Sequence, residues 1–127
     1  MDVTRQLAAF TAGLRYADIP PEVSERTKRL ILDLTGIIIR ARHDAESTPS
    51  LIAAVEALGL ANGRCSVFGD ARSYAPPAAA LINGTLAHSL DFDDTHAEGS
   101  IHSSAPMNES SLRRECRRNR ASAPASR

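Results

Sequence analysis

The sequence contains few aromatic residues and few cysteines, and each scarcity excludes a class of protein. There is no Trp, with two Tyr and three Phe in 127 residues, so the chain lacks the aromatic platforms on which single-stranded nucleic acids stack. The two cysteines, Cys65 and Cys116, are too few for a disulfide framework and lack zinc-site spacing. We therefore expect neither a disulfide-stapled secreted domain nor a zinc module.

Long apolar runs are also absent. The longest apolar stretch, residues 30–39, contains Asp33 and is shorter than the roughly 20 apolar residues that a membrane-spanning helix needs. The first residues lack the basic region and apolar run of a secretory signal. These observations predict a cytoplasmic protein that does not cross a membrane.

Charge is balanced over the whole chain but not along it. Fifteen basic and fifteen acidic side chains give a net charge of zero, which argues against a nucleic-acid or acidic-membrane binder. Residues 1–107 nevertheless carry net −4, whereas residues 108–127 carry net +4. Because Leu112 is the one large apolar residue after Met107, we expect residues 108–127 to be a disordered Arg/Ser-rich tail.

Apolar periodicity predicts an all-α fold for residues 1–107, a length that supports one domain at most. The expected helices cover residues 3–15, 21–43, 49–60 and 78–90. Pro21 suits the first position of the second helix, and Asn62-Gly63 is expected to end the third. Residues 64–69 form a short β-prone segment.

Ionisable side chains gather between His88 and His102, where fifteen residues contain three histidines and four carboxylates. A histidine beside a carboxylate is held in one tautomer and tuned toward neutral pH, as proton transfer requires. If the last helix extended a turn beyond Leu90, Gly84, His88, Asp91 and Thr95 would share one face. The same residue types also occur as turn and cap residues, so spacing alone leaves function and structure both open.

Two further interpretations of this segment are weaker. Asp91, Asp93 and Asp94 could hold Mg²⁺, and His96, His102 and Asp94 could hold Zn²⁺, but neither spacing is a known ligand pattern and we expect no metal. Residues 91–95 also read Asp-x-Asp-x-Thr, similar to the nucleophile loop of haloacid-dehalogenase-type phosphatases. That loop must follow a buried strand, whereas residues 81–88 are predicted to be helical, so we interpret the match as accidental.

Longer motifs resemble one family over roughly residues 4–107. Residues 75–96 (APPAAALINGTLAHSLDFDDTH) and 101–106 (IHSSAP), with the earlier LDLTG at 32–36 and CSVFG at 65–69, are similar to the signature of the MmgE/PrpD family. That family includes 2-methylcitrate dehydratase and cis-aconitate decarboxylase.

The resemblance implies a helical large domain, a separate α+β lid domain and an active site between them, usually in a homodimer. It implies dehydration, decarboxylation or epimerisation of tri- and dicarboxylic acids without an iron–sulfur cluster or other cofactor. Carried over by position, it implies catalytic roles for Asp91 and His102, substrate binding by Thr95 and His88, and supporting roles for Asp93, Asp94 and His96.

The chain departs from the family pattern in two ways. The family continues for several times this length, supplying another His, a Lys, a Tyr and the lid. After Met107 the chain instead becomes Arg- and Ser-rich, and Arg outnumbers Lys fourteen to one. We therefore hypothesise an amino-terminal, catalytically inactive fragment from a truncated or frameshifted reading frame. The alternative is a small helical interaction protein whose basic tail binds nucleic acid or an acidic partner through charge.

Overall fold

Four α-helices account for most of the structure, a computed structural model that describes residues 2–105. They are α1 (Val3–Gly13), α2 (Pro21–Asp44), α3 (Thr48–Ala57) and α4 (Pro76–His88). Short 3₁₀ turns, η1 (Tyr16–Asp18) and η2 (Ala97–Gly99), and two antiparallel ladders complete it: β1 (Cys65–Ser66) with β2 (Ser73–Tyr74), and β3 (Thr95–His96) with β4 (Ile101–His102). The predicted helical class is confirmed, and β1 lies within the β-prone segment expected at residues 64–69, whereas the β3–β4 ladder was not predicted. The tail expected at 108–127 lies outside the described residues.

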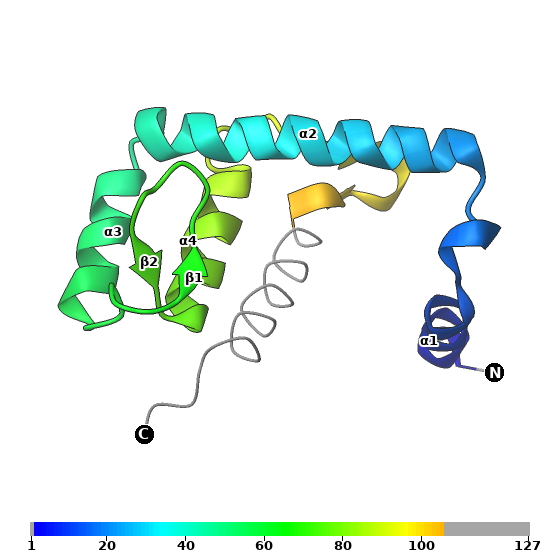
Figure 1. Cartoon of the computed structure of the whole chain (residues 1–127). Coiled ribbons are helices and arrows are strands. Elements are labelled where there is room, and N and C mark those ends of the chain that lie inside the picture. The colour runs from blue at the N-terminus through cyan, green and yellow to red at the C-terminus, as the bar shows by residue number, and fades with distance from the viewer. Residues whose placement is uncertain (1, 106–127) are drawn as a thin grey trace, which may run out of the picture.

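The core lies under the carboxyl-terminal half of α2, where α3, α4 and the β1–β2 ladder pack together (Figure 1). Leu34 and Ile38 of α2 and Ile82 and Leu86 of α4 are buried there. Small residues on α4 are also buried, which allows the two helices to approach closely. This packing fixes the axis of α4, and therefore the direction in which its last residue points.

The third helix ends earlier than the sequence predicted. Gly59 has φ +70°, and the N–H groups of Gly59 and Leu60 donate to the carbonyls of Glu56 and Val55 at 2.9 and 3.1 Å. This is the Schellman arrangement, in which a left-handed glycine satisfies the last carbonyls of a helix. Gly63 does not end the helix. It allows a close backbone approach, because a Cβ at that position would lie 2.0 Å from the carbonyl oxygen of Tyr74.

A buried polar side chain, Asn83, joins α4 to β1. The side-chain amide of Asn83 donates to the Ser66 carbonyl at 3.1 Å, and its oxygen accepts from the Phe68 N–H at 3.0 Å. Both ends of this buried amide are therefore satisfied, which offsets the cost of burying it.

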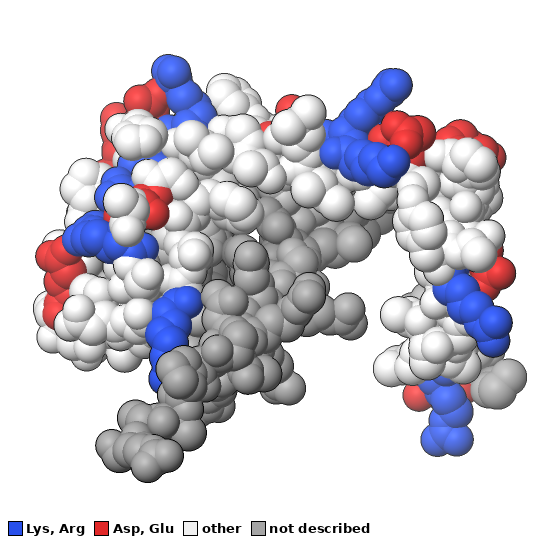
Figure 2. Space-filling view, in the orientation of Figure 1, with Lys and Arg blue, Asp and Glu red and all other residues white. Residues whose placement is uncertain are grey.

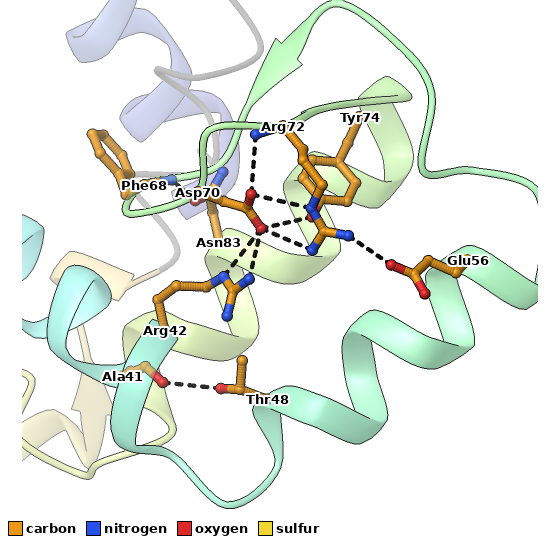
Figure 3. A network of polar contacts seen from close by, with 9 residues as sticks. All are labelled: Ala41, Arg42, Thr48, Glu56, Phe68, Asp70, Arg72, Tyr74 and Asn83. Carbon is orange, nitrogen blue, oxygen red and sulfur yellow. Dashed lines mark hydrogen bonds and ion pairs between the residues drawn. The ribbon is translucent and has the colours of Figure 1, made fainter.

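The loop between β1 and β2 is held by Asp70, whose side chain is 5% exposed (Figure 3). Its carboxylate accepts hydrogen bonds from Arg42 at 2.8 Å, from Arg72 at 3.1 Å and from the Tyr74 hydroxyl at 2.7 Å. The Arg72 guanidinium holds the pKa of Asp70 well below its usual range, although burial opposes this. Burial, together with the hydrogen bond to Asp70, raises the pKa of Tyr74 to about 12. The network ties α2 to the ladder.

The first helix differs from the rest because none of its residues is buried. It projects from the far end of α2 as a separate arm (Figures 1 and 2). Its apolar stripe, Val3, Leu7, Phe10 and Leu14, is exposed, although the predicted amphipathic helix itself is confirmed. Among the described residues no helix is both long enough and apolar enough to span a bilayer.

Candidate functional site

The site begins where α4 ends, at His88. The following Ser89 still bonds back into the helix, because its N–H donates to the Thr85 carbonyl at 2.9 Å. The Asp91 N–H then donates to the His88 carbonyl at 3.0 Å, and Asp91 has φ +54°. The helix extension considered from the sequence is therefore wrong, because a left-handed residue cannot continue a right-handed helix.

A tight hairpin returns the chain to the end of α4. In the β3–β4 ladder, Thr95 is the direct partner of His102, and His96 is the partner of Ile101. Directly opposed residues present their side chains on the same face of a ladder. Thr95 thus lies opposite His102 in the ladder, and not on a helix face with His88 and Asp91 as the sequence spacing suggested.

Asp93 lies at the centre of the site. Its side chain is fully buried, and its two oxygens lie 2.9 Å from Nδ1 of His88 and 3.1 Å from Nδ1 of His102. The contact with His88 is a hydrogen bond. The contact with His102 lacks hydrogen-bond alignment, which leaves Asp93 Oδ2 and His102 Nδ1 as buried polar atoms without a partner. The two imidazole rings meet edge to face, with centroids 4.7 Å apart.

The charge on Asp93 acts directly on His88. Hydrogen bonding to Asp93 raises the pKa of His88 above its usual value, and the Coulombic attraction of Asp93 and Asp91 adds to this, while desolvation opposes it. The upward shift increases the fraction of His88 that is protonated at a given pH.

The structure brings together most of the residues that the sequence singled out, but not all of them. Four of them each place one nitrogen or oxygen atom that could ligate a metal within 4.8 Å of the others: His88, Asp91, Asp93 and His102. Asp94 instead accepts a hydrogen bond from the Ser104 N–H at 3.0 Å. His96 accepts one from the Gly99 N–H at 3.0 Å. Asp94 and His96 therefore shape the hairpin around the site.

The sequence did not reveal that Asp93, expected to be a supporting residue, is the buried member of the cluster. Its burial could not be read from the motif, because three carboxylates occur within four residues and only Asp93 among them is buried. A weak signal was available, since the middle of such a group is the member that can lie between two flanking histidines.

The four clustered residues are also the group within residues 2–105 whose donor atoms could converge on a metal ion. Neither metal trio considered from the sequence forms a separate group there, because Asp94 and His96 are engaged in the hairpin. The expectation that no metal is bound stays a prediction.

The phosphatase interpretation fails on the local structure. The residues before Asp91 belong to α4 and not to a buried strand, so the Asp91 carboxylate is not presented at the carboxyl edge of a parallel sheet. The chemistry of the site must therefore be sought in the histidine–carboxylate cluster.

Comparison with known proteins identifies the family. The family model of the MmgE/PrpD N-terminal domain matches residues 5–108. The chain belongs to the MmgE/PrpD family. No solved structure gave a significant match.

The curated relatives of this MmgE/PrpD chain are similar to it over most of its length. The cis-aconitate decarboxylase-like protein oryM of Aspergillus oryzae is 33% identical over 84% of the chain. The cis-aconitate decarboxylases of Aspergillus terreus and Homo sapiens are 31% and 28% identical over 81% and 78% of it. The chain spans only 21–22% of the length of these relatives.

The interaction-protein alternative gains no support from the described surface. On the face shown in Figure 2, Lys and Arg side chains are interspersed with Asp and Glu, so the described residues present no basic surface there. The tail at 108–127, on which that alternative depends, lies outside the described residues.

Proposed function

We propose that this chain forms one wall of the active site of a lyase that dehydrates or decarboxylates a tri- or dicarboxylic acid, with 2-methylcitrate and cis-aconitate as the substrates to test. The observation that carries the proposal is the buried Asp93 between His88 and His102, with Asp91 beside them. The naming of the relatives as cis-aconitate decarboxylases supports the choice of substrate class.

Both reactions need proton transfer beside carboxylate groups. In dehydration, a base removes the proton on the carbon next to a carboxylate, and an acid protonates the hydroxyl group that leaves as water. In decarboxylation, the bond to the departing carboxyl group breaks, its electron pair stays on the remaining carbon, and an acid delivers a proton to that carbon. Two imidazoles that share one carboxylate can supply an acid and a base near neutral pH.

We assign the individual roles that the family resemblance implies, and the positions in the cluster are compatible with them. Asp91 and His102 act on the reacting atoms, and Thr95 hydrogen-bonds a substrate carboxylate from its place opposite His102. His88 binds the substrate through its positive charge and can donate its second imidazole proton to it. Asp93 supports the pair, while Asp94 and His96 hold the hairpin.

We further propose that the rest of the site lies in the part of the family sequence that this chain does not match. The chain spans about a fifth of its relatives, and its cluster is open on one side, because His88 and His102 keep 55% and 37% of their side-chain surface exposed. On this proposal the 127-residue chain alone turns over neither acid. The complete enzyme works without a cofactor and as a homodimer.

A chimera tests this function. Residues 5–105 replace the matching segment of the Aspergillus terreus cis-aconitate decarboxylase, and CO₂ release from cis-aconitate and water loss from 2-methylcitrate are measured. We expect turnover of one acid, and a loss of about 10²–10⁴-fold in kcat for Asp91→Asn or His102→Gln.

The matched control is His43→Gln, an exposed histidine on α2 outside the cluster, which should leave kcat unchanged. A folded, dimeric chimera that turns over neither acid would contradict the proposal. So would full activity in both cluster variants.

A further inference from the structure

The unequal contacts around Asp93 assign different charge states to the two histidines. We propose that Asp93 is a positioning residue that makes His88 and His102 an unequal pair near neutral pH, with His88 protonated and His102 neutral. The assignment of acid and base roles below rests on the proposed function, whereas the charge states rest on the geometry of the cluster, which the raised pKa of His88 supports.

One buried carboxylate cannot neutralise two imidazolium ions. The Asp93 side chain has no exposed surface. Water therefore does not solvate its negative charge, and a positively charged partner is favoured beside it. Both imidazoles place Nδ1 within 3.1 Å of it, and their ring centroids are only 4.7 Å apart. Protonating both rings would place two positive charges side by side, so protonation of one disfavours protonation of the other.

Geometry decides which ring carries the proton. His88 has an aligned hydrogen bond to Asp93 Oδ1 at 2.9 Å, whereas the His102 contact with Oδ2 at 3.1 Å is not aligned. A charge-assisted hydrogen bond stabilises the protonated imidazole more than an unaligned contact does.

The surroundings of His88 act in the same direction. The titratable groups that interact with it in the described part of the chain are Asp93, Asp91 and His102. The two carboxylates raise the pKa of His88. His102 is the one group among them that opposes its protonation, and it does so only when it is itself charged.

The pair then divides the work of proton transfer. His88 directs Nδ1–H to Asp93 and retains a second proton on Nε2, which it can donate. A neutral His102 that keeps its proton on Nδ1, toward the negative carboxylate, has an unprotonated Nε2 that can accept one. Paired groups with separated pKa values are how active sites assign an acid and a base. Asp93 touches no reacting atom in this arrangement and acts through both rings.

Proton NMR titration of the 127-residue chain tests the inference without any turnover. The Cε1 protons of all four histidines are followed against pH and assigned with single His→Gln variants. We expect His88 to lose its proton at higher pH than His102. The reverse order would overturn the inference.

Two isosteric variants separate the buried carboxylate from its exposed neighbour. Asp93→Asn should lower the pKa of His88 more than Asp91→Asn does, although each removes one negative charge, while His43 should titrate unchanged in both. Equal shifts in the two folded variants would contradict the positioning role.

A third variant keeps the test decisive if Asp93→Asn does not fold. His102→Gln removes a ring that is neutral while His88 titrates, so the pKa of His88 should stay close to its wild-type value. A marked rise would show that His102 is already charged in that range and would contradict the proposal. An active chimera lacking the unequal pair would refute this inference alone. An unequal pair in an inactive chimera would leave this inference standing and refute the proposed function.

Discussion

Two buried carboxylates in this chain have opposite surroundings. Asp70 is fully engaged, with two guanidinium groups and the Tyr74 hydroxyl around it. Asp93 is even more buried, but its neighbours are two imidazoles, and one of its oxygens has no hydrogen bond.

The comparison shows that a buried carboxylate can either stabilise the fold or take part in proton transfer. A carboxylate between permanently charged arginines keeps one protonation state over the whole physiological range, which stabilises a fold. A carboxylate between histidines is surrounded by groups whose charge changes near neutral pH, which suits proton transfer. The partners, and not the carboxylate itself, decide which use applies.

The largest expected effect comes from breaking the Asp70 network. Asp70→Asn leaves the partly buried Arg42 without its counter-charge, so the free energy of unfolding should fall by about 2–3 kcal/mol. Urea unfolding followed by circular dichroism measures this change.

Two matched variants sharpen that comparison. Asp93→Asn keeps an oxygen that can accept from His88, and should cost about 1 kcal/mol or less. Asp33→Asn on the exposed surface of α2 should change stability by less than about 0.5 kcal/mol. If Asp93→Asn lowered the free energy of unfolding more than Asp70→Asn does, Asp93 and not Asp70 would be the main structural carboxylate.

Acid should weaken the Asp70 network next. Because the pKa of Asp70 is lowered in the folded chain, its contribution to stability is present above its ordinary pKa of 3.8 and is lost as the pH falls toward the lowered value. The free energy of unfolding should therefore drop more steeply below about pH 4 in the wild type than in Asp70→Asn. Parallel pH profiles for the two proteins would show that Asp70 does not carry this dependence.

The smallest expected effect is a loss of stability as the pH rises, and it comes from the His88–Asp93 pair. The pKa of His88 is raised, so the contribution of the His88–Asp93 pair is complete below the ordinary pKa of 6.5 and is lost as the pH rises through the raised value. Stability should fall slightly over that window in the wild type and stay flat in His88→Gln. Because His88 is largely exposed, solvent screening keeps the effect small, and urea midpoints at several pH values are needed to detect it.

Much of the local structure could be predicted from the sequence. The four helices follow from apolar periodicity, and Pro21 begins α2 as expected. The end of α3 was misplaced because two glycines, Gly59 and Gly63, compete as terminators, and only the position of Tyr74 shows that Gly63 is required by close backbone approach. The Asp70 network was not predicted, because Arg42 lies on a distant helix.

The candidate site was predicted as a segment but not as an arrangement. The density of histidines and carboxylates marked residues 88–102, and the motif identified the family. The sequence did not reveal that α4 stops at His88, nor that a hairpin brings Thr95 opposite His102.

By itself, the sequence determined the helices, the family and the segment that carries the ionisable groups, because each depends on local pattern or composition. Only the tertiary structure decided that Asp93 lies between His88 and His102. These two histidines come from a helix end and a returning strand, and their separation is set by how the hairpin folds back. Burial also depends on everything that packs around a group, so three carboxylates within four residues take on different surroundings.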